Sequence, residues 1–170
     1  MTCLSHRLPR SRFAKTASTV FAALLCTSIG ISAARSAKGI HLEGPHRLRL
    51  PPITVSDSPQ QVTSGLKLLR LNNVRDTNGW ILSADVLDGA LTGRRTGERI
   101  PASLTFRSIQ WVRGGNCSAA GIKVHPDGAS IEADPGFGIG EFKITFEVRY
   151  DAPAFPLADR YHGVTTFIVQ

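Results

Sequence analysis

Three arginines lie close together in one short, glycine-punctuated segment of this 170-residue chain, TGRRTGER at 92–99. They are Arg94, Arg95 and Arg99. Guanidinium groups form paired hydrogen bonds with carboxylates and phosphates, so these arginines have the chemistry to hold an anionic polymer. The glycines predict a loop, and loops of β-domains often carry binding residues. The alternative is a solvated loop that only keeps the protein in solution.

No other residues have the spacing of a catalytic or metal site. His41 and His46 are the closest histidine pair beyond residue 37, and they fall on opposite faces of an extended segment. No serine lies in a Gly-x-Ser-x-Gly turn. The glycines of GFGIGE (136–141) precede a strand, so they predict a hairpin and not a phosphate-binding loop. We therefore expect no enzyme activity, no cofactor and no metal ion.

The segment WILSADVL (80–87) raises a question about its first residue. Trp80 alternates with Leu82, Ala84 and Val86, a pattern that predicts one strand face. On that pattern the indole belongs to the core, where its N–H would need a hydrogen-bond acceptor. The alternative is an exposed ring that stacks on a ligand, so Trp80 is a candidate both for the core and for ligand binding.

The first 37 residues have the layout of a secretory signal peptide. Basic residues precede an uncharged stretch at 16–34, and Ala34 ends a small-residue cleavage site, with Ala37 as a second candidate. We therefore expect export, and a mature chain that begins between Arg35 and Lys38. The alternative is an uncleaved membrane anchor, because the stretch is just long enough to span a bilayer.

The formal net charge of +7 comes mainly from that segment. Five of the 20 Lys and Arg residues, and none of the 13 acidic residues, lie in 1–37, so the chain from Lys38 onward has a net charge of +2. This near balance argues against a nucleic-acid partner. Cys117 is the one cysteine beyond residue 37, so we expect no internal disulfide and a fold stabilised by its core.

Beyond residue 38, short strand-like runs alternate with turn residues, and no helical periodicity is seen. The clearest run, EFKITFEVRY (141–150), alternates apolar and polar residues and predicts a strand with one buried face. The pattern predicts an all-β fold, an antiparallel β-sandwich of the immunoglobulin-like or Greek-key type with about seven to nine strands. Residues 38–52 are compatible with a first strand or a loose amino-terminal arm. Further strands are expected within 46–50, 53–55, 65–74, 80–87, 104–112, 121–125, 129–133 and 163–170.

The order of these features resembles the WxL domain, a cell-surface β-domain of Gram-positive and related bacteria that is named for Trp-x-Leu motifs. The first motif appears here as Trp80-Ile81-Leu82, and RIPASLTF (99–106) is similar to the segment that usually follows. The similarity covers roughly residues 46–170. The resemblance implies that these motif residues belong to a β-domain.

The second motif of that family reads Tyr-x-Gly, with Trp-x-Leu beginning six residues after the tyrosine. This chain has Tyr161 and Gly163 at the first two places, then Phe167 and Val169 where the family has tryptophan and leucine. The spacing is kept and the apolar character is kept. The resemblance therefore implies core positions for these residues. If the family's tryptophan is exposed and stacks on sugar rings, its loss here would weaken binding.

The resemblance implies an exported protein that is held non-covalently at the cell surface through peptidoglycan. We expect a signal peptide at 1–34, an amino-terminal arm at 35–45 and a WxL-like domain at 46–170. The expected function is that of a secreted or cell-surface binding protein without catalytic activity. Its partners would be peptidoglycan or another anionic wall polymer, and other surface proteins. Membrane contact is expected only through an uncleaved signal peptide.

Two alternatives stay open. The first is a structural subunit of a surface fibre or coat, because the final run VTTFIVQ (164–170) could pair with the sheet edge of a neighbour. The second is a small secreted hydrolase. That enzyme would need an acid, a base or a metal site that the sequence does not show.

Overall fold

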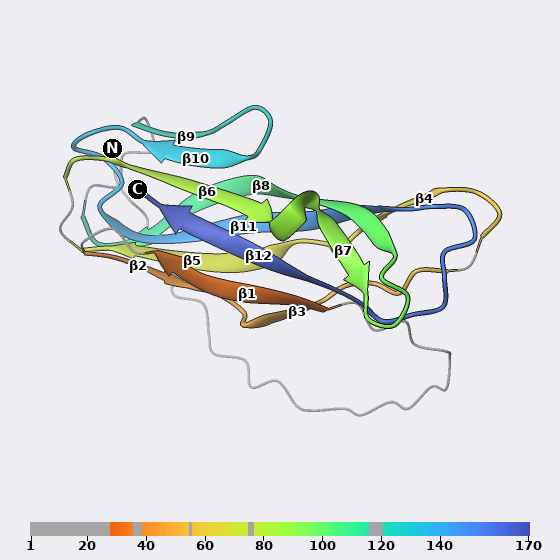
Figure 1. Ribbon diagram of the computed structural model, residues 1–170. Helices are drawn as coiled ribbons and strands as arrows, with labels where there is room; N and C mark the ends of the chain where they lie inside the picture. The colour runs from red at the N-terminus through yellow and green to blue at the C-terminus, as the bar shows by residue number, and fades with distance from the viewer. Residues whose placement is uncertain (1–27, 36–38, 55, 75–76, 116–120) are drawn as a thin grey trace, which may run out of the picture.

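The fold is almost entirely β-stranded (Figure 1). Residues 1–27 of the predicted signal peptide lie outside the described residues, and so does Cys117. The prediction of cleavage therefore stays a prediction. The computed structural model describes residues 28–35, 39–54, 56–74, 77–115 and 121–170.

Twelve strands and one short 3₁₀ turn are present in this part of the chain, more than the seven to nine strands expected. Several of the additional strands have only three or four residues, too few to show a clear alternation of apolar and polar positions. The elements are β1 (Ser28–Arg35), β2 (Ile40–Glu43), β3 (Arg47–Arg49), β4 (Gln60–Thr63), β5 (Lys67–Asn73), β6 (Trp80–Val86), η1 (Leu87–Gly89), β7 (Ala90–Gly93), β8 (Arg99–Arg113), β9 (Ile122–Val124), β10 (Ser130–Ala133), β11 (Gly140–Ala152) and β12 (Tyr161–Val169).

The predicted all-β, antiparallel class is confirmed. The main strand order is β2-β5-β11-β8-β7-β12-β6-β10-β9, with β1, β3 and β4 paired beside it, and among the described strands only β1 with β12 is parallel. The long β8 pairs first with β7 and then with β11, so the pairing is continuous. It does not by itself separate the strands into the two sheets of the predicted sandwich, and the immunoglobulin-like or Greek-key type stays a prediction.

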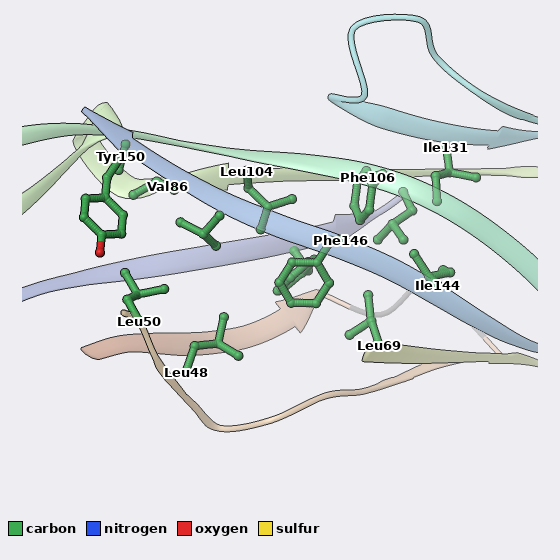
Figure 2. Packing of buried hydrophobic residues seen from close by; sticks show 14 of the residues in the cluster. Leu48, Leu50, Leu69, Val86, Leu104, Phe106, Ile131, Ile144, Phe146 and Tyr150 are labelled. Carbon is green, nitrogen blue, oxygen red and sulfur yellow. The ribbon is translucent and has the colours of Figure 1, made fainter. Parts of the chain in front are cut away.

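The alternating strand at 141–150 is present as β11, and its apolar residues form the centre of the core (Figure 2). Phe142, Ile144, Phe146, Val148 and Tyr150 are all buried, and the polar residues between them are more exposed. Alternation in the sequence therefore becomes one apolar face and one polar face, as strand geometry requires. Burial of such side chains is the main favourable contribution to folding.

Aromatic rings link strands that are not hydrogen-bonded to each other. The ring of Phe167 in β12 lies 5.4 Å from that of Phe146 in β11 and 6.3 Å from that of Phe106 in β8, measured between centroids. The faces of β11 and β12 thus pack against each other across the core. Contacts between aromatic rings in such orientations stabilise the fold beyond the area they bury.

The segment at 38–52, which the sequence leaves open, contains strands. Ile40 in β2 is fully buried, and β2 pairs with β5. Leu48 in β3 and the following Leu50 are buried as well. Residues 40–43 of the expected amino-terminal arm are therefore part of the sheet, because Ile40 and the β5 edge provide burial and backbone hydrogen bonds that a solvated arm would lack.

Strand β1 lies within the segment that we predict to be a signal peptide. It pairs in parallel with β12 between Ser28 and Arg35, and antiparallel with β3 between Ser28 and Gly30. Across the described ranges, no helix is both long enough and apolar enough to cross a membrane.

Candidate functional site

Trp80 belongs to the core. It is 2% exposed, and its indole N–H donates a 2.9 Å hydrogen bond to the backbone carbonyl of Gly138. The ring contacts Phe142 edge to face, with centroids 6.1 Å apart. The core interpretation is therefore confirmed, and the alternative of Trp80 as an exposed ligand-stacking residue is wrong, because the indole has no free face.

The glycine-rich GFGIG segment has a structural role beside Trp80. Gly138 has a φ of +72°, and a Cβ atom there would lie only 2.4 Å from the indole nitrogen of Trp80. The carbonyl of Gly138 accepts a second hydrogen bond, 2.9 Å long, from the buried amide of Asn73. The absence of a side chain lets the backbone approach close enough to provide the acceptor that the indole needs.

The other motif residues are buried too, as a core role requires. Leu82, Tyr161, Phe167 and Val169 all have buried side chains. Gly163 lies close to its neighbours, because a Cβ atom there would be 2.9 Å from a methyl group of Leu91. These four buried side chains offer no surface to a ligand, so any binding surface must be sought elsewhere.

The segment at 92–99 contains the predicted loop, which the structure shows as the turn of a hairpin between β7 and β8. The N–H of Gly93 donates to the carbonyl of Glu98 at 2.8 Å, and the N–H of Gly97 donates to the carbonyl of Gly93 at 3.0 Å. Arg94, Arg95 and Arg99 are exposed. We call residues 92–99 the arginine loop. Figure 1 places it at one end of the molecule, with the carboxy terminus toward the other end.

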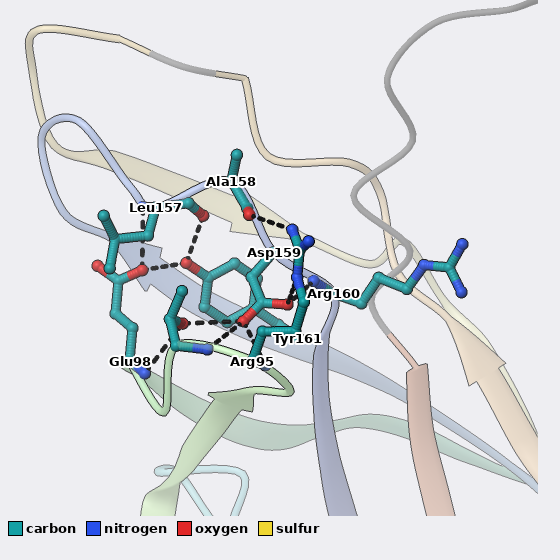
Figure 3. A network of polar contacts seen from close by, with 8 residues as sticks. Arg95, Glu98, Leu157, Ala158, Asp159, Arg160 and Tyr161 are labelled. Atoms are coloured by element: carbon teal, nitrogen blue, oxygen red, sulfur yellow. Dashed lines mark hydrogen bonds and ion pairs between the residues drawn. The ribbon is translucent and has the colours of Figure 1, made fainter.

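A buried carboxylate holds the arginine loop in place (Figure 3). The side chain of Asp159 is 1% exposed. One of its oxygens accepts hydrogen bonds from the backbone N–H groups of Arg95 and Thr96, each 2.8 Å long, and from the Thr96 hydroxyl at 2.9 Å. The other oxygen accepts the N–H of Arg160 at 2.6 Å.

These donors keep Asp159 charged. Burial on its own would raise the pKa of this carboxyl, because it disfavours the ionised form. The hydrogen bonds from the N–H groups of Thr96, Arg95 and Arg160 and from the Thr96 hydroxyl outweigh that effect and hold the pKa well below its ordinary value. Asp159 therefore acts as a permanent anchor near neutral pH.

A second contact ties the same two segments together. The carboxylate of Glu98 accepts hydrogen bonds from the hydroxyl of Tyr161 and from the N–H of Leu157, the latter 3.0 Å long. The Tyr161 hydroxyl also lies 2.8 Å from the carbonyl oxygen of Leu157. Burial, and next the hydrogen bond to Glu98, raise the pKa of Tyr161 well above its ordinary value.

The guanidinium groups of Arg95 and Arg99 do not share a partner. Arg95 is exposed, and it donates to the carbonyl of Ala158 at 3.1 Å and lies 3.7 Å from Asp159. Arg99 donates to the carbonyl of Asp88 at 2.9 Å. No side-chain partner of Arg94 is seen within the described residues. Each guanidinium has five N–H donors, so most donors stay open to a ligand.

The sequence did not single out the residues that build this site around the arginines. Asp159, Glu98 and the exposed Arg160 were not among the candidates, although Arg160 lies beside the loop: the N–H of Arg94 donates to its carbonyl at 3.0 Å. The available signal was an acidic residue two positions before Tyr161 in the Pro-rich segment that leads to β12. Across the described ranges, no three His, Cys, Asp or Glu side chains come together as a metal site would require.

Comparisons with known proteins do not assign this chain to a family. No family model matches it, and no curated protein matches it. The resemblance to the WxL domain therefore rests on the motif residues quoted above, and the function is argued from the site itself.

Proposed function

We propose that this chain is an exported binding protein without catalytic activity. In this proposal it is held non-covalently at the cell surface, and the arginine loop contacts peptidoglycan or another anionic wall polymer. The observation that supports the proposal most is the anchoring of the exposed arginine loop by the buried Asp159. A binding loop that is already ordered loses little conformational freedom when a ligand binds.

The local balance of charge favours an anionic ligand. Arg94, Arg95, Arg99 and Arg160 are exposed at this end of the molecule. Two of the acidic residues beside them are held by local contacts, because Asp159 is buried and Glu98 accepts from a tyrosine hydroxyl and a backbone N–H. Asp88, whose backbone carbonyl accepts from Arg99, is exposed. The chain from residue 38 has a net charge of only +2, so attraction to a polyanion would have to come from such a local group.

The test is retention of the protein on isolated cell walls over a range of salt concentrations. Exposed charges are screened over about 8 Å at physiological salt, so retention should fall as salt rises. The variant with Arg94, Arg95 and Arg99 all changed to Ala should be retained less and should melt at nearly the same temperature, because exposed ion pairs and hydrogen bonds contribute little to stability.

A matched control removes the same charge from another part of the surface. Arg47, Arg49 and Arg70 are exposed and lie in β3 and β5, outside the arginine loop. Their triple change to Ala lowers the net charge by the same amount and should leave retention close to that of the parent. Equal retention of the parent and both triple variants at every salt concentration would contradict a role for the arginine loop.

A second candidate function is a structural subunit of a surface fibre or coat. One observation favours it: β12 has β1 along one edge, from His162 to Ile168, and β1 lies in the predicted signal peptide. If cleavage occurs after Ala34, that edge loses most of its partner strand and becomes available to a strand from another chain. Size-exclusion chromatography of the exported protein separates the two functions, since the binding protein should elute as a discrete species and the subunit as a series of polymers.

A further inference from the structure

Phe155 is exposed although it is a large aromatic residue. Its side chain is 67% exposed, the largest fraction among the exposed large apolar residues of the described chain. The next residue, Pro156, is buried, so the segment before β12 is packed against the fold. A ring this exposed contributes little to the core and is accessible to a ligand.

The backbone at Phe155 is unfavourable for this residue type. Its φ is +51°, in the left-handed region that favours glycine, and Asp88 is the other described non-glycine residue with a positive φ. The conformation is held by a 2.8 Å hydrogen bond from the Phe155 N–H to the carbonyl of Ser56. Glycine or asparagine would adopt it at lower cost. Strained residues of this kind often mark functional positions.

Phe155 lies in the segment that the site network holds against the arginine loop. Two residues on, the N–H of Leu157 donates to Glu98, and the next carbonyl, of Ala158, accepts from the guanidinium of Arg95. Figure 3 shows these contacts between the two segments. Phe155 therefore belongs to a segment whose backbone is fixed to the arginine loop two and three residues further on.

We propose that Phe155 is the residue that stacks on a sugar ring of an acidic glycan, while Arg94 and Arg95 bind the carboxylate or phosphate groups of that glycan. A phenyl ring has a flat apolar face that packs against the C–H groups of a pyranose, and the neighbouring guanidinium groups match its anionic substituents. This inference rests on the proposed function and refines it. It also transfers to Phe155 the ligand-stacking role that the buried Trp80 does not have.

The arrangement favours a glycan over a lipid surface or a protein groove. Phe155 and Leu157 are the two large apolar side chains exposed in this segment, and charged residues lie beside them. A single aromatic ring near cationic side chains suits a ligand that carries both small apolar faces and negative charges. Insertion into a bilayer would depend on apolar area and not on ring shape. Substitutions of Phe155 can therefore distinguish glycan binding from membrane binding.

The experiment measures binding of the full chain to isolated walls for the parent, Phe155→Tyr and Phe155→Leu. The tyrosine keeps the ring and should keep the affinity, whereas leucine keeps the apolar character without the ring and should weaken binding about tenfold. Walls from which phosphate polymers have been removed by acid show whether carboxylates or phosphates are bound. Binding that survives this treatment is carried by carboxylates.

The matched control is Trp111→Leu, the same replacement at the second exposed aromatic residue of the described ranges. Trp111 is 38% exposed and lies twelve residues along β8 from Arg99, roughly 40 Å in an extended strand. Its indole N–H donates to the carbonyl of Gly114 at 2.7 Å, so its place is explained by the local turn. This variant should bind walls as the parent does.

Each outcome decides between the two proposals. If the parent is not retained on walls, the proposed function fails and this inference fails with it. If the parent is retained and the triple arginine variant is not, but Phe155→Leu binds as the parent does, the proposed function stands and the role of Phe155 is overturned. Binding of Phe155→Leu and the parent alike to vesicles of anionic lipid, with no binding to walls, would assign this surface to a membrane.

Discussion

Asp159 is the residue on which the arginine loop depends. Its carboxylate receives three backbone N–H groups and one hydroxyl, and the two segments that it joins are more than sixty residues apart in the chain. Replacement by asparagine keeps the shape but places an amide where the loop requires only acceptors. Such a group cannot satisfy all the buried donors, and unsatisfied donors destabilise a fold.

The first prediction concerns the pH dependence of this anchor. The folded pKa of Asp159 lies below its ordinary value of 3.8, so its carboxylate contributes stability that is fully present above that value and is lost as the pH falls toward the folded pKa. Thermal melting of the parent and of Asp159→Asn between about pH 2 and pH 7 should therefore show a difference in melting temperature that is constant above about pH 5 and narrows in acid. A constant difference across the whole range would contradict the anchoring role.

The second prediction concerns Trp80. Its change to Ala should lower the free energy of unfolding by about 3–5 kcal/mol, as truncation of buried aromatic residues does, which is much of the stability of a typical domain. Denaturant unfolding measures this loss. In the variant Trp111→Phe the remaining tryptophan is Trp80, and its fluorescence should be shifted to the blue in the folded protein. Normal stability of Trp80→Ala would contradict the core position.

For single residues, local sequence patterns predicted which side chains are buried, but they did not predict which residues those side chains contact. The alternation of Trp80 with Leu82 correctly placed the indole in the core, because strand geometry alone decides which face a residue occupies. Its hydrogen-bond acceptor, the carbonyl of Gly138, could not be predicted, since it lies 58 residues away in the chain. The same applies to Asp159, whose bonds join residues that no local pattern connects.

At the scale of elements, the β7–β8 hairpin requires a glycine at its base. A Cβ atom on Gly93 would lie 2.4 Å from the hydroxyl oxygen of Thr96 and 2.8 Å from a carboxylate oxygen of Asp159. The close approach of Asp159 to the loop thus depends on the missing side chain. This couples the strand end to the network that holds the arginines.

The third prediction follows from that contact. Gly93→Ala should destabilise the protein by about 1–3 kcal/mol through overpacking and should also weaken retention on walls, because the loop must move. Gly97→Ala is the control in the same turn: open space surrounds that position, and the cost there is the positive φ alone, about 1–2 kcal/mol. Urea unfolding measures both. Retention of Gly93→Ala at the level of the parent would show that loop position does not matter for binding.

The elements themselves were predictable where they are long. The strands now seen as β6 and β11 appear in the sequence as alternating runs, and β12 was expected from the last strand-like run at 163–170. Their antiparallel class followed from short connections. Of the strands of three or four residues, β3, β9 and β10 lie within predicted runs. Strands β4 and β7 were not predicted, because four residues carry little pattern. The parallel pairing of β1 with β12 joins segments more than 130 residues apart. A turn motif predicts pairing only between strands that are adjacent in the chain, so it could not predict this pairing.

At the scale of the whole molecule, the amino-terminal segment has two descriptions that an experiment must reconcile. Its sequence predicts a signal peptide, and part of it forms β1 beside β12. The fourth prediction is that exported protein begins between Arg35 and Lys38, which amino-terminal sequencing measures. A chain that keeps Arg12 and stays with the membrane fraction would show an uncleaved anchor instead.

We propose that the end of the molecule built by the arginine loop and the segment at 153–160 is the binding surface. Amide hydrogen exchange of the full chain, with and without soluble peptidoglycan fragments, tests it most directly because it maps contact along the backbone. We predict that bound fragments slow exchange in residues 92–99 and 153–160 and leave the turn after Trp111 unchanged. Slower exchange at the Trp111 turn, with no change in the arginine loop, would contradict the proposal that the arginine loop is part of the binding surface.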